Sequence, residues 1–311
     1  MERPFGMQSN ASTVCVEKVK NILSYDEIAT ALHSVLDRMK EDISLAPNST
    51  ALIKVNLCLL KGNETGATVD PRIAGALVDW LIENYNPKKI YLAEADATHL
   101  SADMAFQILG WQDYFKGYPK VEFLNLSRDE RIPVQGTFIK ELAMSNSMMK
   151  TDFLISLAKL KTHTTQKISC IMKNQFGSIP YKYKIVYHPI LAKAIYDATS
   201  VRIPNLCIID GLVSMEGNGP TNGIPRRTKL VLASNDPVSM DHFCARLMGF
   251  RPESVPHLRL AIGRGLGRTH YNVLGNPPDP LNLKFKFLPR WKEVLKKSIG
   301  LMRRGTINEE T

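Results

Sequence analysis

The chain has 311 residues, of which 44% are hydrophobic and 23% charged, as in a folded globular protein. No apolar run reaches the roughly 18 residues of a membrane-spanning helix, and residues 1–12 lack the apolar core of a secretory signal. The five cysteines are dispersed without a CxxC pair, so we expect no zinc site, no intrinsic iron–sulfur cluster, and reduced thiols in a cytoplasmic setting.

The net charge of +10 is spread unevenly along the chain. Between Leu281 and Gly305 the sequence has eight Lys or Arg residues and a single acid, whereas the preceding part is only mildly basic. The positive charge is therefore weak support for nucleic-acid binding. No helix-turn-helix or zinc-finger pattern is present either, so we expect no specific nucleic-acid partner.

The predicted elements of the first half alternate between strands and helices. We expect strands at 13–16, 51–57, 90–94 and 121–126, with helices at 24–42, 70–81 and 101–110. Ser24 and Glu27 form a capping box at the first helix. Asp70, followed by Pro71, marks the start of the second helix.

The second half continues the same alternation. Strands are expected at 153–157, 206–210 and 230–233, and helices at 166–175, 189–200, 236–249 and 256–265. The pattern predicts an α/β fold with mostly parallel sheets covered by helices on both faces, in two lobes with a cleft between them. We expect an N-terminal lobe over residues 1–150, a C-terminal lobe over 151–275, and a Pro-rich linker with a basic amphipathic tail over 276–311.

One stretch, from Phe153 to Tyr196, carries seven lysines and no Asp or Glu. Its apolar start, 153–157, indicates a buried strand, and Lys159, Lys161 and His163 follow directly. Open α/β sheets bind ligands beyond the carboxyl ends of their strands. The stretch therefore predicts a cationic pocket for a phosphate or carboxylate, with a solvated basic face as the alternative.

Further polar residues are expected at the ends of other strands. Lys54 and Asn56 share one face of the strand 51–57 and form a candidate ligand-facing pair, unless Lys54 reaches solvent at a sheet edge. The loop 94–99 has two carboxylates and a histidine, which could hold a metal or hydroxyl groups, or serve as an acid/base pair. Asp210, at the end of the strand 206–210, is a candidate metal or hydroxyl ligand.

The lysine-rich stretch also contains candidate catalytic groups. Neighbouring lysines should lower the pKa of His163, and a neutral imidazole suits a general base or a metal ligand. Lys173 and Asn174 can donate to an oxyanion, and Gly177 lets the backbone approach a ligand. We assign catalytic roles to His163, Lys161 and Lys173. The predicted ligand-binding residues are Lys54, Asn56, Lys159, Asn174, Gly177, His188 and Asp210.

These motifs occur in the order found in one protein family. The chain resembles the family called domain of unknown function 362, through residues 54–57, 68–71, 157–163, 173–177, His188, 210–211, 219–220 and 234–241. Many members of that family carry an appended ferredoxin-type domain with two iron–sulfur clusters. This chain lacks that cysteine-rich segment, so the resemblance implies no cluster of its own.

The fold is also distantly similar to that of the catalytic protein of nickel-dependent lactate racemase. That enzyme binds a phosphorylated pincer nucleotide through lysines and histidines, and Lys161, His163 and Lys173 occupy suggestive positions here. The similarity is one of fold, with no residue-by-residue correspondence. It implies a phosphorylated small molecule or a divalent metal as the cofactor.

Two classes of function follow from these observations. The first is an enzyme, an isomerase or an oxidoreductase, that binds a small anionic or phosphorylated substrate or cofactor in a lysine-rich cleft. The second is a non-catalytic accessory or redox-partner protein that binds a cofactor or a membrane surface. Residues 281–305 are expected to bind an anionic membrane surface or an acidic protein, or to pack on the domain. A cytoplasmic or peripheral membrane location follows.

Overall fold

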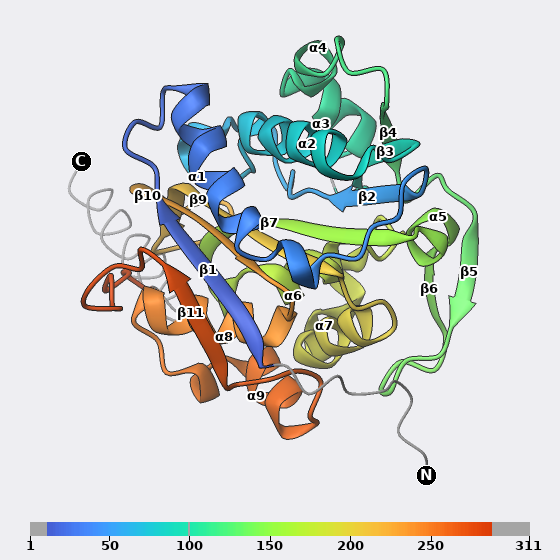
Figure 1. The fold of residues 1–311 in the computed structure, drawn as a ribbon. Coiled ribbons are helices and arrows are strands. Elements are labelled where there is room, and N and C mark those ends of the chain that lie inside the picture. The colour runs from blue at the N-terminus through green and yellow to red at the C-terminus, as the bar shows by residue number, and fades with distance from the viewer. Residues whose placement is uncertain (1–10, 99, 288–311) are drawn as a thin grey trace, which may run out of the picture.

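A nine-stranded sheet forms the centre of the computed structural model, which describes residues 11–98 and 100–287 (Figure 1). The strand order is β11-β1-β10-β9-β7-β2-β3-β4, and β8 pairs with β7. The strands are β1 (Ser12–Lys18), β2 (Thr50–Lys54), β3 (Lys89–Glu94), β4 (Val121–Asn125), β7 (Phe153–His163), β8 (Lys167–Ser169), β9 (Leu206–Glu216), β10 (Ile224–Ser234) and β11 (Tyr271–Gly275). A separate hairpin pairs β5 (Arg131–Val134) with β6 (Leu142–Ser145).

The centre of the sheet is parallel. Strands β9, β7, β2, β3 and β4 run in the same direction, whereas β10 is antiparallel to both β9 and β1. Parallel strands end at the same edge, so the polar residues that close β2, β3 and β7 meet there. The predicted mostly parallel α/β sheet is confirmed.

Helices cover the sheet on both faces, as predicted (Figure 1). Helices α1 to α3 pack on one face around Leu32, Leu77 and Ile155. Helices α6 to α9 pack on the other face around Met172, Ile195 and Phe243. The helices are α1 (Tyr25–Asp37), α2 (Pro71–Tyr85), α3 (Ala102–Ile108), α4 (Trp111–Tyr114), α5 (Asn146–Lys150), α6 (Ile171–Gly177), α7 (Leu191–Ser200), α8 (Pro237–Met248) and α9 (Pro256–Gly263). Short 3₁₀ turns are η1 (Lys40–Asp42), η2 (Asn63–Thr65), η3 (Lys184–Ile190) and η4 (Pro252–Ser254).

Several predicted elements differ from the structure, three of them near the site. The strand expected at 51–57 ends at Lys54, so Asn56 lies beyond it and does not share a strand face with Lys54. The strand expected to end at residue 157 continues to His163, so Lys159, Lys161 and His163 lie within β7 and not after it. Pairing with β8 and β9 extends the strand, and buried acceptors satisfy its two lysines. The helix expected at 166–175 was partly wrong, because residues 167–169 form β8 and α6 begins only at Ile171.

Strands from both sides of the predicted domain boundary pair within one sheet. Residues 51–54 of β2 lie beside residues 153–156 of β7. The predicted boundary between the two lobes near residue 150 thus separates two strands that pair with each other. The division into two lobes stays a prediction. Across the described ranges, no helix is both long and apolar enough to cross a membrane.

The start of the predicted tail packs on the domain. The amide of Phe285 donates to the carbonyl of Met248 at the end of α8 (2.9 Å), and the Phe285 side chain is buried. The Lys286 carbonyl accepts from the amide of Gly217 (2.8 Å). Residues 288–311, which carry most of the predicted basic amphipathic tail, lie outside the described residues, and the membrane or protein partner of the tail stays a prediction.

Candidate functional site

A pocket of about 220 Å³ lies beyond the carboxyl ends of β2 and β3. Its described lining includes four lysines, Lys161, Lys173, Lys182 and Lys184, and one carboxylate, Glu94. Asn56, Cys58, Phe176, Gly177 and His188 also contribute. The structure thus brings together Asn56, Lys161, Lys173, Gly177 and His188 of the predicted site residues. A larger and more open hollow near His242 and Arg246 contains none of them.

Helix α6 brings three of the predicted residues to this edge of the sheet. Its N-cap, Cys170, makes no side-chain bond to the first turn. Asp241 of α8 does so instead, accepting from the amides of Ile171 (2.8 Å) and Met172 (3.2 Å). The carboxylate satisfies amides that would otherwise lack partners at the helix start. Asp241 therefore fixes the helix that presents the pocket residues, a role not evident from the sequence.

Asn174 of α6 ties the helix to the ends of two strands. Its amide nitrogen donates to the carbonyl of Lys54 (3.0 Å) and to the hydroxyl of Ser156 (3.0 Å). Its oxygen accepts from the ammonium of Lys54 (3.2 Å) and from the Asn56 amide (3.4 Å). Asn174 is buried and does not line the pocket, so its contacts make it a positioning residue for Asn56.

Lys54 forms a buried ion pair behind the pocket. Its Nζ lies 2.6 Å from Oε1 of Glu94, and it also donates to the carbonyl of Val55 (2.6 Å). Burial lowers the pKa of Lys54, and Glu94 opposes that shift. A Cβ on Gly177 would lie 3.3 Å from this Nζ, so glycine allows α6 to approach the pair closely. Glu94 therefore pairs with Lys54, acts on Lys184 through its charge, and forms no ion pair with Lys161 or Lys173 among the described residues.

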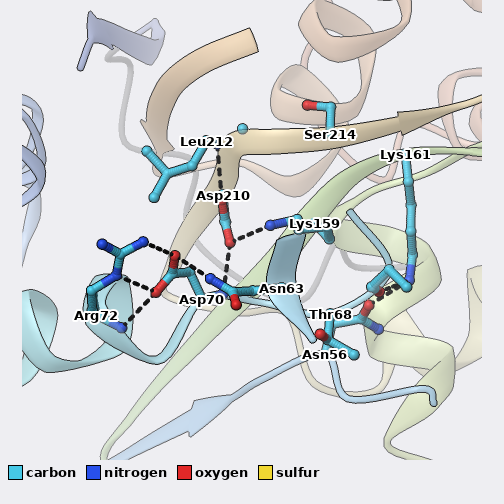
Figure 2. Close-up of polar contacts among 12 residues, drawn as sticks. Asn56, Asn63, Thr68, Asp70, Arg72, Lys159, Lys161, Asp210, Leu212 and Ser214 are labelled. Carbon is cyan, nitrogen blue, oxygen red and sulfur yellow. Dashed lines mark hydrogen bonds and ion pairs between the residues drawn. The ribbon is translucent and has the colours of Figure 1, made fainter. Parts of the chain in front are cut away.

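Lys161 is buried without an acidic partner. Its Nζ donates to Oδ1 of Asn56 (2.7 Å; Figure 2). It also donates to the carbonyl of Ala67 (2.6 Å) and lies 3.2 Å from Sγ of Cys58. Within residues 11–98 and 100–287, no carboxylate pairs with it. The residue is 1% exposed. The ammonium of Lys161 is thus fixed at the pocket wall by three uncharged groups.

Lys173 and Lys184 add charge that is only weakly compensated. Among the described residues, Lys173 forms no ion pair, and its Nζ stands 4.3 Å from the centre of the Phe176 ring. Burial, and then repulsion by Lys161, lower the pKa of Lys173 to about 7. Lys184 donates to the carbonyl of Asp96, and burial lowers its pKa to about 8. The two ammonium groups therefore release protons more easily than ordinary lysines.

Lys159 and Asp210, both predicted ligand-binding residues, pair with each other instead of lining the pocket (Figure 2). Their Nζ and Oδ2 atoms are 2.7 Å apart, and both side chains are fully buried. Asp210 also accepts from the amides of Asp70 (2.8 Å) and Leu212 (3.0 Å). Asp70 in turn caps α2 by accepting from the amide of Arg72 (3.0 Å). The pair thus anchors the start of α2.

His163 lies close to the lysines but outside the pocket lining. Burial, followed by the charge of Lys173, holds its pKa well below the usual range, in the predicted direction. Its Nδ1 accepts from the amides of Thr165 (3.3 Å) and Gln166 (3.4 Å). The neutral ring therefore carries its proton on Nε2, and action as a base at Nε2 would require breaking those bonds. His188, in contrast, is an exposed pocket residue.

Sequence reasoning did not single out Cys58, Lys182 or Lys184 as pocket residues. Cys58 follows Asn56 by two positions, but both lie beyond the end of β2 at Lys54, so strand alternation gave no signal for a shared face. Lys184 could be recognised as a pocket residue only from the path of η3 over the pocket, and no local sequence pattern predicts that path. In the part of the chain that the structure describes, no group of three or more His, Cys, Asp or Glu is arranged to hold a metal ion.

Comparison with known protein families identifies the same family that the sequence motifs indicate. Residues 51–246 match the family described as domain of unknown function (DUF362). The chain belongs to this family. The predicted membership is confirmed, and the match takes in all of the predicted catalytic and ligand-binding residues of this DUF362 chain.

Two individual proteins are similar to the DUF362 chain over part of their length. It is 30% identical over 158 residues to a thylakoid-associated protein of Synechocystis sp., which covers 49% of this chain and 48% of that protein. The match thus spans about half the length of the curated relative. The lactate racemase apoprotein of Thermoanaerobacterium thermosaccharolyticum gives a TM-score of 0.41 at 11% identity, over 74% of this chain and 55% of that chain. A similarity of that size carries no argument about chemistry.

Proposed function

We propose that this DUF362 chain is an enzyme that binds a small phosphorylated substrate or cofactor in the lysine-lined pocket. The observation that carries the proposal is the convergence of Lys161, Lys173 and Lys184 on one pocket whose one described carboxylate is already paired. A buried ammonium without a counter-ion is unfavourable. An anion that enters the pocket supplies the missing negative charge.

The three groups nearest the proposed anion have distinct roles. Lys161 is fixed by its donations to Asn56 and the Ala67 carbonyl, and its third N–H, which now meets the weak acceptor Sγ of Cys58, is the one that a bound anion accepts. Asn56, which Asn174 contacts, turns its oxygen to Lys161 and is oriented to offer its amide as a neutral donor. A phosphoryl group accepts charge-assisted hydrogen bonds from such donors. Lys161 and Asn56 therefore bind and orient the anion.

Lys173 is the residue proposed to exchange a proton with the substrate. Its pKa of about 7 in the free protein lets the amine gain or release a proton near neutral pH. Lysines with a lowered pKa serve as bases and nucleophiles near neutral pH. The reaction class that fits is proton abstraction at a carbon beside a carbonyl or carboxylate, as in an isomerase. Lys161 then stabilises the negative charge that develops on oxygen.

The copurifying ligand tests this proposal. The full-length protein is purified anaerobically and denatured, and the released small molecules and metals are identified by mass spectrometry and elemental analysis. We expect a phosphorylated compound that is lost in Lys161→Met and kept in Lys193→Met, which changes an exposed lysine of the same acid-free stretch outside the pocket lining. A chain that carries no such compound and does not bind inorganic pyrophosphate would contradict the proposal.

A further inference from the structure

Exposed apolar side chains are concentrated at one edge of the pocket. Of the thirteen large hydrophobic residues that are exposed among the described residues, five fall within residues 181–190. Their exposed fractions range from 39% to 67%. They are Tyr181, Tyr183, Ile185, Val186 and Ile190, which together form the apolar rim. Scattered exposed apolar residues are ordinary on a protein surface, whereas a cluster of this kind marks an interaction site.

The apolar rim is continuous with the cationic pocket. Lys182, Lys184 and Ile185 of the same segment line the pocket. The Nζ of Lys182 stands 5.9 Å from the centre of the Tyr183 ring, so positive charge and aromatic surface lie side by side. No acid occurs between residues 153 and 196. Any surface that contacts the rim therefore meets apolar groups and the lysines of the same segment together.

We propose that the apolar rim docks on an anionic lipid surface and that the pocket receives a phosphorylated lipid headgroup. The inference rests on the proposed function and names its ligand class as a phosphorylated amphiphile. Tyrosine and aliphatic side chains partition into the boundary between headgroups and acyl chains. Lysines beside them are attracted to anionic lipids. Docking places the opening of the pocket at the depth where phosphate groups lie.

Vesicle flotation of the full-length chain tests the inference. Vesicles contain phosphatidylcholine alone or phosphatidylcholine with phosphatidic acid. The rim variant combines Tyr183→Ser with Val186→Ser. Its matched control combines Met104→Ser with Ile108→Ser, two exposed apolar residues of similar exposed fraction on α3. Residues 288–311 are present in every protein, so their contribution stays constant.

We expect the wild-type chain to bind the phosphatidic acid vesicles roughly tenfold more strongly than the neutral ones, because several lysines face the surface. The rim variant should lose about tenfold or more of this binding, since two apolar side chains no longer enter the interface. The control variant should bind as the wild type does. Equal binding by the rim variant and the wild type would overturn the inference, as would equal losses in both variants.

Binding of soluble pyrophosphate separates this inference from the proposed function. We expect the rim variant to bind pyrophosphate with wild-type affinity, whereas Lys161→Met should lose it. A wild-type chain that binds pyrophosphate but neither vesicle overturns lipid docking alone and leaves a soluble phosphate ester or an acidic protein as the ligand. If no protein binds pyrophosphate, the proposed function fails, and the headgroup assignment fails with it.

Discussion

Lys159 and Lys161 lie two residues apart on β7, both are 1% exposed, and they differ in their partners (Figure 2). Lys159 contacts the carboxylate of Asp210 at 2.7 Å, away from the pocket lining. Lys161 contacts an amide, a carbonyl and a thiol, and it reaches the pocket. The first charge is balanced within the fold. The charge of Lys161 has no carboxylate partner among the described residues, so a bound anion can balance it. This difference is the physical basis of the proposed site.

The two lysines should respond differently to substitution. Removing one partner of a buried ion pair leaves an uncompensated charge in the interior, which is costly. Removing a buried charge that has no counter-ion relieves an unfavourable interaction. Stability should therefore depend on Lys159 and its carboxylate, and ligand affinity on Lys161.

The largest effect is expected for Asp210→Ala, which leaves Lys159 without its counter-ion and removes the acceptor for the amides of Asp70 and Leu212. The free energy of unfolding should fall by about 3–5 kcal/mol. Urea denaturation followed by circular dichroism measures it. The double change Lys159→Met with Asp210→Leu should restore part of the loss, because it removes the unpaired ammonium but leaves the amides of Asp70 and Leu212 without their acceptor. A loss below about 1 kcal/mol in the single variant would show that the pair is not a structural element.

Lys161→Met should produce the opposite pattern. The free energy of unfolding should stay the same or rise, because a buried ammonium is replaced by an apolar side chain of similar length. Pyrophosphate affinity should fall on the order of 100-fold, since a charge-assisted contact is lost. Equilibrium dialysis and urea denaturation measure the two quantities, with Lys193→Met as the control. Strong destabilisation with unchanged affinity would reverse the roles assigned to the two lysines.

The pH dependence of binding should identify Lys173. Its pKa in the free protein is lowered to about 7, and a bound anion raises that pKa, so binding above pH 7 requires uptake of a proton. Affinity for sulfate, whose charge is constant in this range, should be level below pH 7 and weaken by up to about tenfold per pH unit above it. Titration calorimetry across pH measures this dependence. Lys173→Met should remove the inflection near pH 7 and keep the one from Lys184, whose pKa is about 8. If Lys173→Met left the pH dependence of sulfate affinity unchanged, the proton taken up on binding would belong to another group.

The smallest effect is expected for Asp241→Asn. The variant keeps the shape of the side chain but has one oxygen in place of two, so it can accept from only one of the amides of Ile171 and Met172 at the start of α6. We expect a loss of about 1 kcal/mol in the free energy of unfolding. Faster hydrogen exchange should be confined to the first turn of α6. Destabilisation without any change in α6 exchange would mean that Asp241 acts elsewhere, for example on His257, whose Nε2 lies 3.5 Å away.

The fold and the cationic pocket were largely predictable because both depend on local patterns. Apolar runs and caps such as Ser24 and Asp70 placed most elements of the parallel sheet. The acid-free stretch marked Lys161 and Lys173 as charges with no nearby counter-ion in sequence. The two meet in one pocket because Lys161 lies near the end of β7 and Lys173 lies on α6, which packs against that strand.

The partners of the remaining residues were not predictable, since they depend on strand register. Lys159 meets Asp210 because β7 and β9 place these two residues opposite each other. Lys54 meets Glu94 because β2 and β3 are aligned with Lys54 beside Ala93. No single-sequence pattern fixes such an alignment. Lys54, Lys159 and Asp210 were therefore predicted to bind the ligand, and Glu94 was a candidate metal, hydroxyl or acid/base group. The structure separates paired charges from unpaired ones.

A crystal structure of the full-length chain with bound pyrophosphate would test the central claim most directly. The account predicts one anion within hydrogen-bond distance of the Nζ atoms of Lys161 and Lys173, with the Lys159–Asp210 pair intact. An empty pocket at saturating pyrophosphate, or an anion that displaces Asp210 from Lys159, would contradict it.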